Sequence, residues 1–237
     1  MKRLLLILLF LVIFTCSTIA KGYFFPLEGD WVVFKEKPGG PGLNLYAVRL
    51  ELEKKEYFFR LSKNFLRNQR LKNHHFHGFK KEVRAIEDGW VEEVQDFVQE
   101  NHVDHPNITP GFSRGNYIVI QQIDGVRVTY SSLAFGSICV KKGLYVRKGN
   151  RLGLTGNSGN NLLPGLCLEA KKRGKDTSLI FKNIAVRYKG YAKEREVEKE
   201  FLRDIFYKSG VLAPGEVVAH QHPRLDPHAI VSESKLR

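Results

Sequence analysis

A chain of 237 residues is long enough for one substantial domain with additions, and its 43% hydrophobic content excludes wholesale disorder. The formal net charge is +13 at pH 7, or +11 once Lys2 and Arg3 are set aside. A basic surface of this kind suits nucleic acid, anionic lipid headgroups or an anionic cell-wall polymer as partners. It is equally compatible with a solvated surface that binds none of them.

Residues 1–20 have the pattern of a secretory signal peptide. A positive start precedes the apolar stretch Leu4–Phe14, and residues 18–20 form a small-residue cleavage site. The apolar stretch is too short for a comfortable membrane span. We therefore expect export to the periplasm or cell envelope, which disfavours nucleic acid as a partner. Cys16 leaves open a lipoprotein signal, and a lipid there is the one route by which we expect membrane attachment.

The first half of the mature chain predicts short strands and two polar excursions. Residues 23–34 indicate a first strand, and Leu45–Leu50 alternates with period two, as a half-buried strand does. The basic stretch Lys63–Lys81 and the polar residues 95–114 each predict a loop at the surface. Between them, residues 83–94 recover strand character around a turn at Asp88-Gly89.

The middle of the chain predicts hairpins. Gly115–Ile123 and Val126–Leu133 are apolar segments joined by Asp124-Gly125, a strong hairpin signal, and glycines then divide Cys139–Leu168 into short pieces. This punctuation predicts a mainly β protein with a compact antiparallel sheet or sandwich as its core. Cys139 and Cys167 are the two cysteines after the signal, and whether they pair stays open.

The C-terminal part changes period. Apolar residues recur at helical spacing over residues 192–208, which predicts one amphipathic helix within residues 189–210. Residues 211–237 carry several prolines and little periodicity, which predicts a flexible tail. Residues 21–188 are then expected to form the β domain.

Several blocks of the central region, in order and in spacing, resemble the LytM/lysostaphin-like zinc endopeptidases, which cut peptide cross-links in bacterial cell walls. The blocks are Glu82–Ala85 with Asp88–Val91, Gly115–Ile120, Gly136–Gly143 with Val146–Gly149, and Gly156–Asn160. Weaker matches at Gly29–Trp31 and Tyr46–Val48 precede them. The resemblance implies a β fold of the duplicated hybrid motif type, with residues 82–170 as its best-matched core.

This resemblance also implies a particular zinc chemistry. In the family a His and an Asp about four residues apart supply two zinc ligands, and the second His of a late His-x-His supplies the third. The metal keeps an open position, so that its bound water becomes a nucleophile near neutral pH. The first His of that pair, with the His of a Tyr-x-His-Leu block, assists proton transfer and holds the oxyanion.

Carried over by position, none of these residues survives. Leu45 and Arg49 stand in the places of the first two ligands, and Cys167 stands in the place of the third. Ser132 and Gly165 stand in the places of the two catalytic histidines. Arg49 puts a permanent positive charge where a dication would sit. The sequence therefore predicts a degenerate member with neither the zinc site nor the catalytic residues.

The leading hypothesis is an exported, non-catalytic domain that needs no cofactor. By resemblance, its partner would be peptidoglycan, a cell-wall hydrolase or another envelope protein. The groove that holds substrate in the family would then be lined by Arg49, Ser132 and Cys167.

Two alternatives belong to other classes. The first is an active zinc endopeptidase acting on peptidoglycan, with relocated ligands from His74, His75 and His77; neighbouring lysines and arginines oppose it by repelling a cation. The second is nucleic-acid or anionic-surface binding, since Phe65, Phe76 and Phe79 interleave with the charges of Lys63–Lys81 as in a stacking surface. Local packing by these aromatic residues is the plainer interpretation.

Overall fold

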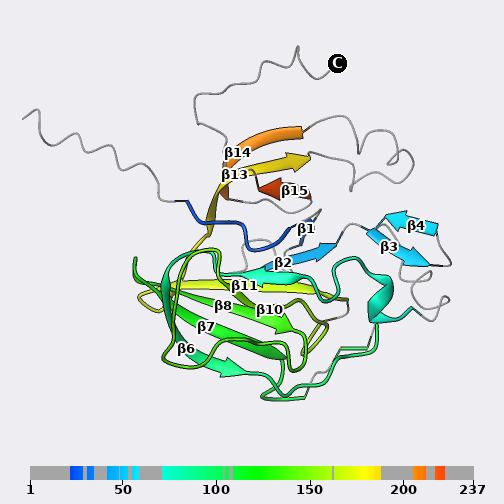
Figure 1. The fold of residues 1–237 in the computed structure, drawn as a ribbon, viewed down its shortest axis with the longest axis horizontal. Coiled ribbons are helices and arrows are strands. Elements are labelled where there is room, and N and C mark those ends of the chain that lie inside the picture. The colour runs from blue at the N-terminus through cyan, green and yellow to red at the C-terminus, as the bar shows by residue number, and fades with distance from the viewer. Residues whose placement is uncertain are drawn as a thin grey trace, which may run out of the picture.

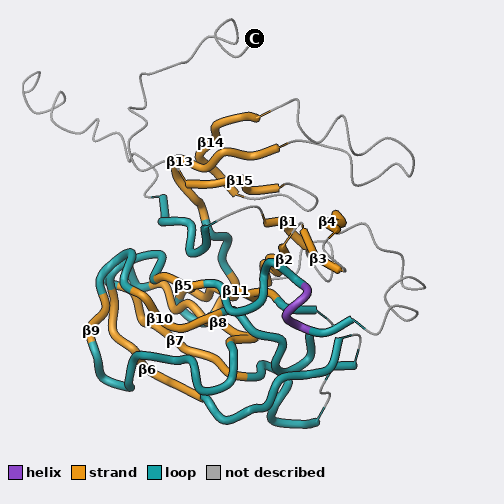
Figure 2. The backbone as a smooth tube through the Cα atoms, turned by 45° about the vertical axis from the view of Figure 1, so that its right-hand side comes forward, coloured by secondary structure: helices purple, strands orange, loops and turns teal. Residues whose placement is uncertain are grey.

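The computed structural model describes residues 22–28, 31–34, 42–47, 49–52, 55–58, 71–103, 105–106, 109–161, 163–187, 205–211 and 217–221. Its strands are β1 Trp31–Phe34, β2 Gly42–Ala47, β3 Arg49–Leu52, β4 Lys55–Phe58, β5 Glu82–Arg84, β6 Gly89–Gln95, β7 Asn116–Gln122, β8 Val126–Leu133, β9 Tyr145–Val146, β10 Arg151–Leu154, β11 Gly165–Lys172, β12 Lys175–Asp176, β13 Ile180–Arg187, β14 Ile205–Val211 and β15 Val217–Gln221. One turn of 3-10 helix, η1, spans Asn73–His75 (purple in Figure 2). Within these ranges there is no helix with the length and apolar character needed to span a bilayer.

Most of the strands belong to one antiparallel sheet. Its order is β14-β13-β15-β1-β2-β11-β8-β7-β6-β9, with β12 paired to β11 beside this path. Figure 1 shows β6, β7, β8 and β11 together in the lower body and β13, β14 and β15 at the opposite end. Two smaller ladders, β10-β5 and β3-β4, complete the described strands. The expected mainly β, antiparallel architecture is confirmed.

The predicted central hairpin is present as β7 and β8. The register pairs Asn116 with Leu133 and Gln121 with Arg127. Gly125 has a φ of 82°, which a residue with a side chain rarely adopts, and its N–H donates to the Gln122 carbonyl over 3.0 Å. The strands therefore join through a three-residue loop that ends in a left-handed glycine, as hairpin loops of this length commonly do.

The core lies on one face of β2, β11, β8 and β7 and is closed by the β5-β10 ladder. Alternate residues of each strand are buried in it, which is the period-two pattern of a sheet with one covered face. The core residues of these strands are Leu43 and Leu45, Leu166, Leu168 and Ala170, Val126, Val128 and Tyr130, Ile118 and Ile120, and Val83 and Leu152. The residues between these core positions point to the opposite face of the same strands.

The C-terminal predictions need correction. The predicted helix at 189–210 ends inside β14, which pairs with β13 and sets Val186 opposite Phe206. The helical prediction is therefore wrong from Ile205 on, and residues 189–204 lie outside the described part of the chain. Val217–Gln221 of the predicted tail forms β15 between β13 and β1. Long-range pairing, which no local pattern encodes, made strands of both segments.

Two local predictions also differ from the structure. The strand predicted over Leu45–Leu50 is divided between β2 and β3, which belong to different sheets. The turn at Asp88-Gly89 does not close a hairpin, because β5 pairs with β10 while β6 pairs with β7 and β9. Both differences alter which side chains share a face near the candidate site.

Candidate functional site

Cys167 lies on the face of the sheet that is turned away from the core. Its strand, β11, lies between β2 and β8, and Cys167 pairs with Asn44 on one side and Ser131 on the other. The flanking Leu166 and Leu168 are buried in the core. Because side chains alternate along a strand, Cys167 points the other way, and it is half-buried there.

Leu45 does not lie beside Cys167, and for Arg49 only the backbone is described. Leu45 pairs with Leu166, and both are buried in the core, so the leucine lies on the face opposite to Cys167. Arg49 begins β3, which pairs with β4 in a separate ladder. The side chain of Arg49 lies outside the described part of the chain. Two of the three predicted groove residues, Cys167 and Ser132, thus lie near the end of β8. The position of the third side chain, that of Arg49, is not described.

Ser132 and Gly165 meet at Gly156. The Gly156 N–H donates to the Ser132 carbonyl over 2.9 Å, and the Gly156 carbonyl accepts the N–H of Gly165 over 2.9 Å. A Cβ on Gly156 would lie 2.5 Å from the backbone nitrogen of Ala134, so only glycine fits. The two positions expected for catalytic histidines therefore lie on either side of Gly156, occupied by a serine and a glycine.

Thr155, the residue before Gly156, forms hydrogen bonds that connect a third segment, residues 78–81, to Gly156. Its Oγ1 donates to the Gly78 carbonyl over 2.5 Å and accepts the N–H of Lys81 over 2.8 Å. Two backbone bonds add to these, from Lys80 N–H to the Thr155 carbonyl over 2.9 Å and from Thr155 N–H to the Lys81 carbonyl over 2.8 Å. Thr155 and Gly156 thus join residues 78–81 to the ends of β8 and β11.

This junction reveals a pair of residues that the sequence analysis missed. His77 and Lys81 are four residues apart, the spacing of the first two zinc ligands in the resembled family, with a lysine in place of the aspartate. The weak match at Tyr46–Val48 drew attention to Leu45 and Arg49 instead. The signal that would have found the pair is its position directly before the strong block that begins at Glu82.

The described residues around the histidine cluster do not gather the three donors that a metal centre needs. The rings of His74 and His75 lie edge to face with centroids 4.5 Å apart, and His75 Nδ1 accepts the backbone N–H of Lys72 over 3.1 Å. Burial lowers the pKa of His75, and the neighbouring His74 and Lys72 lower it further. Across the described residues, no three His, Cys, Asp or Glu side chains gather as a metal would need.

The two cysteines do not add a crosslink to this region. Cys139 is exposed, and its thiol donates to the Arg151 carbonyl over 3.3 Å. No disulfide joins Cys139 to Cys167. Cys167 lies on the face of β11 that is turned away from the core, beside the buried Ser131.

A buried polar network stiffens the loops beside the junction. The Asn116 side-chain amide donates to the carbonyls of Val98 and Leu133 over 2.8 and 3.1 Å, and its Oδ1 accepts the Val98 N–H over 2.8 Å. Ser158 Oγ accepts the Asn116 N–H over 2.9 Å and donates to the Leu133 carbonyl over 2.8 Å. Asn116 and Ser158 are both fully buried, so these bonds replace the hydration that the two side chains lose.

Residues 95–114 are anchored to the turn after Gly156. The Glu100 carboxylate accepts the N–H groups of Asn157 and Phe135 over 2.5 and 2.9 Å, and Asn101 Nδ2 donates to the Gly159 carbonyl over 2.6 Å. Burial raises the pKa of Glu100, and the two N–H bonds act in the opposite direction. The predicted long loop is therefore present but held at several points.

The residues at the junction do not fit a zinc ion of the kind the resemblance implies. Such a site needs three ligands of the His, Cys or carboxylate type. The positions supply His77 and Cys167, but Lys81 brings an ammonium group, which repels a dication, and Ser132 and Gly165 bring no imidazole. The backbone hydrogen bonds of the junction are all present, but the three metal-binding side chains that zinc requires are not.

Residues 76–179 match the model of peptidase family M23. The match begins at Phe76, so it contains His77 and Lys81 and leaves out Leu45 and Arg49. The expected relationship to LytM-type peptidases is thereby confirmed for the region that carries the junction.

Three solved structures are similar to this chain at low sequence identity. The chain is similar to a zinc-containing peptidase from Vibrio cholerae, with 20% identity and a TM-score of 0.36 over 65% of this chain and 35% of that one. It is also similar to the deep-sea M23 metalloprotease pseudoalterin, with 12% identity and a TM-score of 0.43 over 84% and 96% of the two chains. A complex of SpoIIIAH and SpoIIQ gives 14% identity and a TM-score of 0.38 over 66% and 96%. The chain spans about a third of the Vibrio cholerae peptidase. No curated protein sequence matches it.

Proposed function

We propose that this chain is an exported, non-catalytic M23 domain that binds the cell wall or regulates a cell-wall hydrolase. The match of residues 76–179 to peptidase family M23, together with the resemblance to endopeptidases that cut cell-wall cross-links, supports peptidoglycan as the binding target. The signal pattern of residues 1–20 supplies the expected location, the periplasm or cell envelope. No cofactor is part of the proposal.

One observation carries the proposal: the backbone junction is intact while its chemical residues are replaced. Thr155 and Gly156 hold residues 78–81, Ser132 and Gly165 together with hydrogen bonds of 2.5 to 2.9 Å. A fold that keeps this geometry while carrying Lys81, Ser132 and Gly165 can still present a groove but cannot activate a water through zinc.

The enzyme alternative finds less support. Relocated ligands from His74, His75 and His77 would have to converge, yet His75 is bonded to Lys72 and no three-donor group forms in the part of the chain that is described. Nucleic-acid binding by the basic stretch also finds less support, because Phe76, one of its proposed stacking residues, is 4% exposed and packs inward.

Co-sedimentation with insoluble peptidoglycan tests the proposal. The chain from Lys21 onward is incubated with purified peptidoglycan, pelleted and quantified, and a parallel sample is added to a wall hydrolase whose rate is followed by turbidity. We expect the chain to pellet with peptidoglycan or to raise the hydrolase rate. A chain that stays in the supernatant and leaves the hydrolase rate unchanged contradicts the proposal.

A pair of tyrosine substitutions locates the effect. Cys167→Tyr places a large side chain on the face of β11 that is turned away from the core, beside the junction, whereas Ile123→Tyr lies at the exposed turn at the other end of β8. We expect the first change to reduce binding or activation and the second to leave it unaltered, with thermal unfolding confirming that both variants are folded. Equal loss in both variants would place the binding surface elsewhere.

A further inference from the structure

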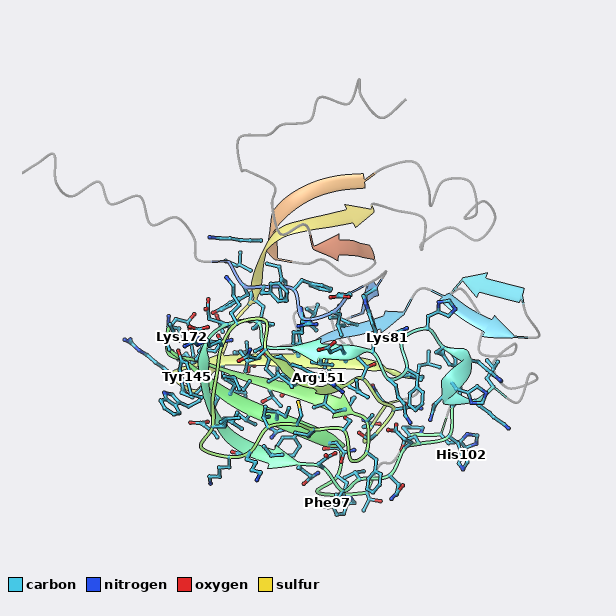
Figure 3. The ribbon with its side chains drawn as sticks, in the orientation of Figure 1. Lys81, Phe97, His102, Tyr145, Arg151 and Lys172 are labelled. Atoms are coloured by element: carbon cyan, nitrogen blue, oxygen red, sulfur yellow. The ribbon has the colours of Figure 1, made fainter. Side chains whose placement is uncertain are left out.

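A hollow of about 360 Å³ opens beside the junction, against the β5-β10 ladder. Its lining is Glu28, Lys80, Lys81, Glu82, Arg151 and Leu154. Figure 3 shows Lys81 and Arg151 between the end of the molecule that carries Tyr145 and the end that carries His102. The volume is at the lower end of the range for small-molecule sites, so it suits a small group and not a polymer.

The two carboxylates that line this hollow, those of Glu28 and Glu82, both lie within salt-bridge distance of one arginine. Arg84, which lies next to it on β5, forms a salt bridge with Glu82 at 3.2 Å and approaches Glu28 at 4.0 Å. The Arg84 guanidinium also donates to the Gly149 carbonyl over 3.1 Å, which holds it in place. One fixed arginine therefore offsets much of the negative charge that lines the hollow.

The three cationic side chains that line the hollow form fewer interactions than its carboxylates do. Lys80, Lys81 and Arg151 are exposed, and within the described ranges no salt bridge links any of them to a carboxylate. Lys80 lies 5.6 Å over the ring of Phe79, and its charge also acts on Glu100. Lys81 and Arg151 are thus the two charges with the most freedom to meet a ligand.

Both charges stand on fixed backbone. Lys81 exchanges two hydrogen bonds with Thr155, and Arg151 pairs with Arg84 in the β5-β10 ladder. Cations held in this way need little reorganisation to meet an anion, which lowers the cost of binding. A guanidinium matches the two oxygens of a carboxylate or phosphate, and an ammonium adds a point charge.

We propose that the hollow lined by Lys81, Arg151 and Lys80 is a binding site for an oxyanion, a carboxylate or phosphate group carried by a small ligand or by the end of a chain. Leu154, half-buried in the lining, offers the one apolar contact for the short carbon skeleton that carries such a group. The site shares Lys81 with the junction, but oxyanion binding there requires neither peptidoglycan nor a cell-wall hydrolase.

Titrations with three probes test this site. The chain from Lys21 onward is titrated with inorganic phosphate, with acetyl-alanyl-alanine and with the C-terminal amide of the same dipeptide, at physiological ionic strength, and followed by NMR. Saturable shifts at Lys81 and Arg151 with phosphate alone support the site and assign it to phosphate groups. Saturation by the dipeptide acid but not by its amide supports the site and assigns it to carboxylates.

Paired substitutions separate a site from general attraction by a basic protein. Lys81→Gln with Arg151→Gln should weaken binding of the saturating probe by about tenfold or more, since charged hydrogen bonds are lost. Arg147→Gln with Lys148→Gln, two exposed cations outside the lining, removes the same charge and should leave the affinity within about twofold. Thermal unfolding verifies both folds.

Three results overturn the proposal: no saturable shift with either anion, equal binding of the dipeptide acid and amide, or equal weakening in the two double variants. None of these assays contains peptidoglycan or a hydrolase. Failure of the oxyanion site and failure of the proposed function are therefore distinguishable.

Discussion

The buried network around Asn116 and the junction around Gly156 lie side by side but differ in what they retain. In the network, each polar atom of Asn116 meets a partner within 3.1 Å. At the junction the backbone bonds are equally regular, yet Ser132, Gly165 and Lys81 carry none of the side chains that the family's chemistry requires. We infer from this difference that the fold depends on the Asn116 network and not on the side chains at the family's ligand and catalytic positions.

Asn116→Ala should cause the largest loss of stability. It leaves the N–H and the carbonyl of Val98 buried without their partner and removes one of the two donors to the Leu133 carbonyl, at an expected cost of about 3–5 kcal/mol in the free energy of unfolding. Chemical denaturation measures this change. Gln121→Ala, on the same strand but half-buried, is the control and should stay within about 0.5 kcal/mol. Similar losses in both would remove the special status of the network.

Tyr130→Phe should have an intermediate effect. The Tyr130 hydroxyl is buried and accepts the N–H of Ile86 over 3.0 Å, so its removal leaves a buried donor at a cost of about 1–2 kcal/mol. Tyr117→Phe, half-buried on β7, should change the free energy of unfolding by less than about 0.5 kcal/mol. An equal or smaller loss for Tyr130→Phe would show that the bond to Ile86 contributes nothing measurable.

The same tyrosine gives a pH dependence with a defined sign. Burial raises the pKa of Tyr130 above its ordinary value near 10, so the folded chain holds the phenol proton more tightly than the unfolded chain. Stability is therefore fully present below pH 10 and falls as the pH rises beyond it. Denaturation profiles between pH 9 and pH 11 should decline less steeply in Tyr130→Phe than in the unaltered chain.

Ser132→Gly should have the smallest effect and the opposite direction. Ser132 has a φ of 65°, in the left-handed region that glycine adopts without strain, so the change should raise the free energy of unfolding by about 0.5 kcal/mol. Ser131→Gly, in the regular part of the same strand, should lower it by about 1 kcal/mol. A clear loss in Ser132→Gly would mean that the serine side chain supports the junction.

The fold was predictable where local chemistry decides it. Asp124-Gly125 specifies the β7-β8 hairpin because Gly125 takes the left-handed conformation that the loop needs. The strand β14 was not predictable, because a short run such as Ile205-Phe206 fits helix and strand periods alike until Val186 pairs with Phe206. Partners so distant in the sequence leave no mark in a local pattern.

The site was predictable in part for a related reason. Ser132, Gly165 and Cys167 lie close in sequence to strong motif blocks, and the structure gathers Ser132 and Gly165 at Gly156. The positions of Leu45 and Arg49 depended on a weak block, and the register instead turns Leu45 into the core against Leu166. The hydrogen bonds between Thr155 and Lys81, which indicate His77 and Lys81 as the pair that corresponds to the first two ligands, are visible only in the tertiary structure.

Metal analysis joined to a hydrolysis assay tests the central claim most directly. The chain from Lys21 onward is incubated with excess zinc, freed of unbound metal, and measured for zinc content and for cleavage of peptidoglycan. A scaffold that retains the junction but lacks its donor set predicts far less than one zinc per chain and no cleavage above buffer. One tightly held zinc per chain, with cleavage abolished by a chelator, would contradict the account.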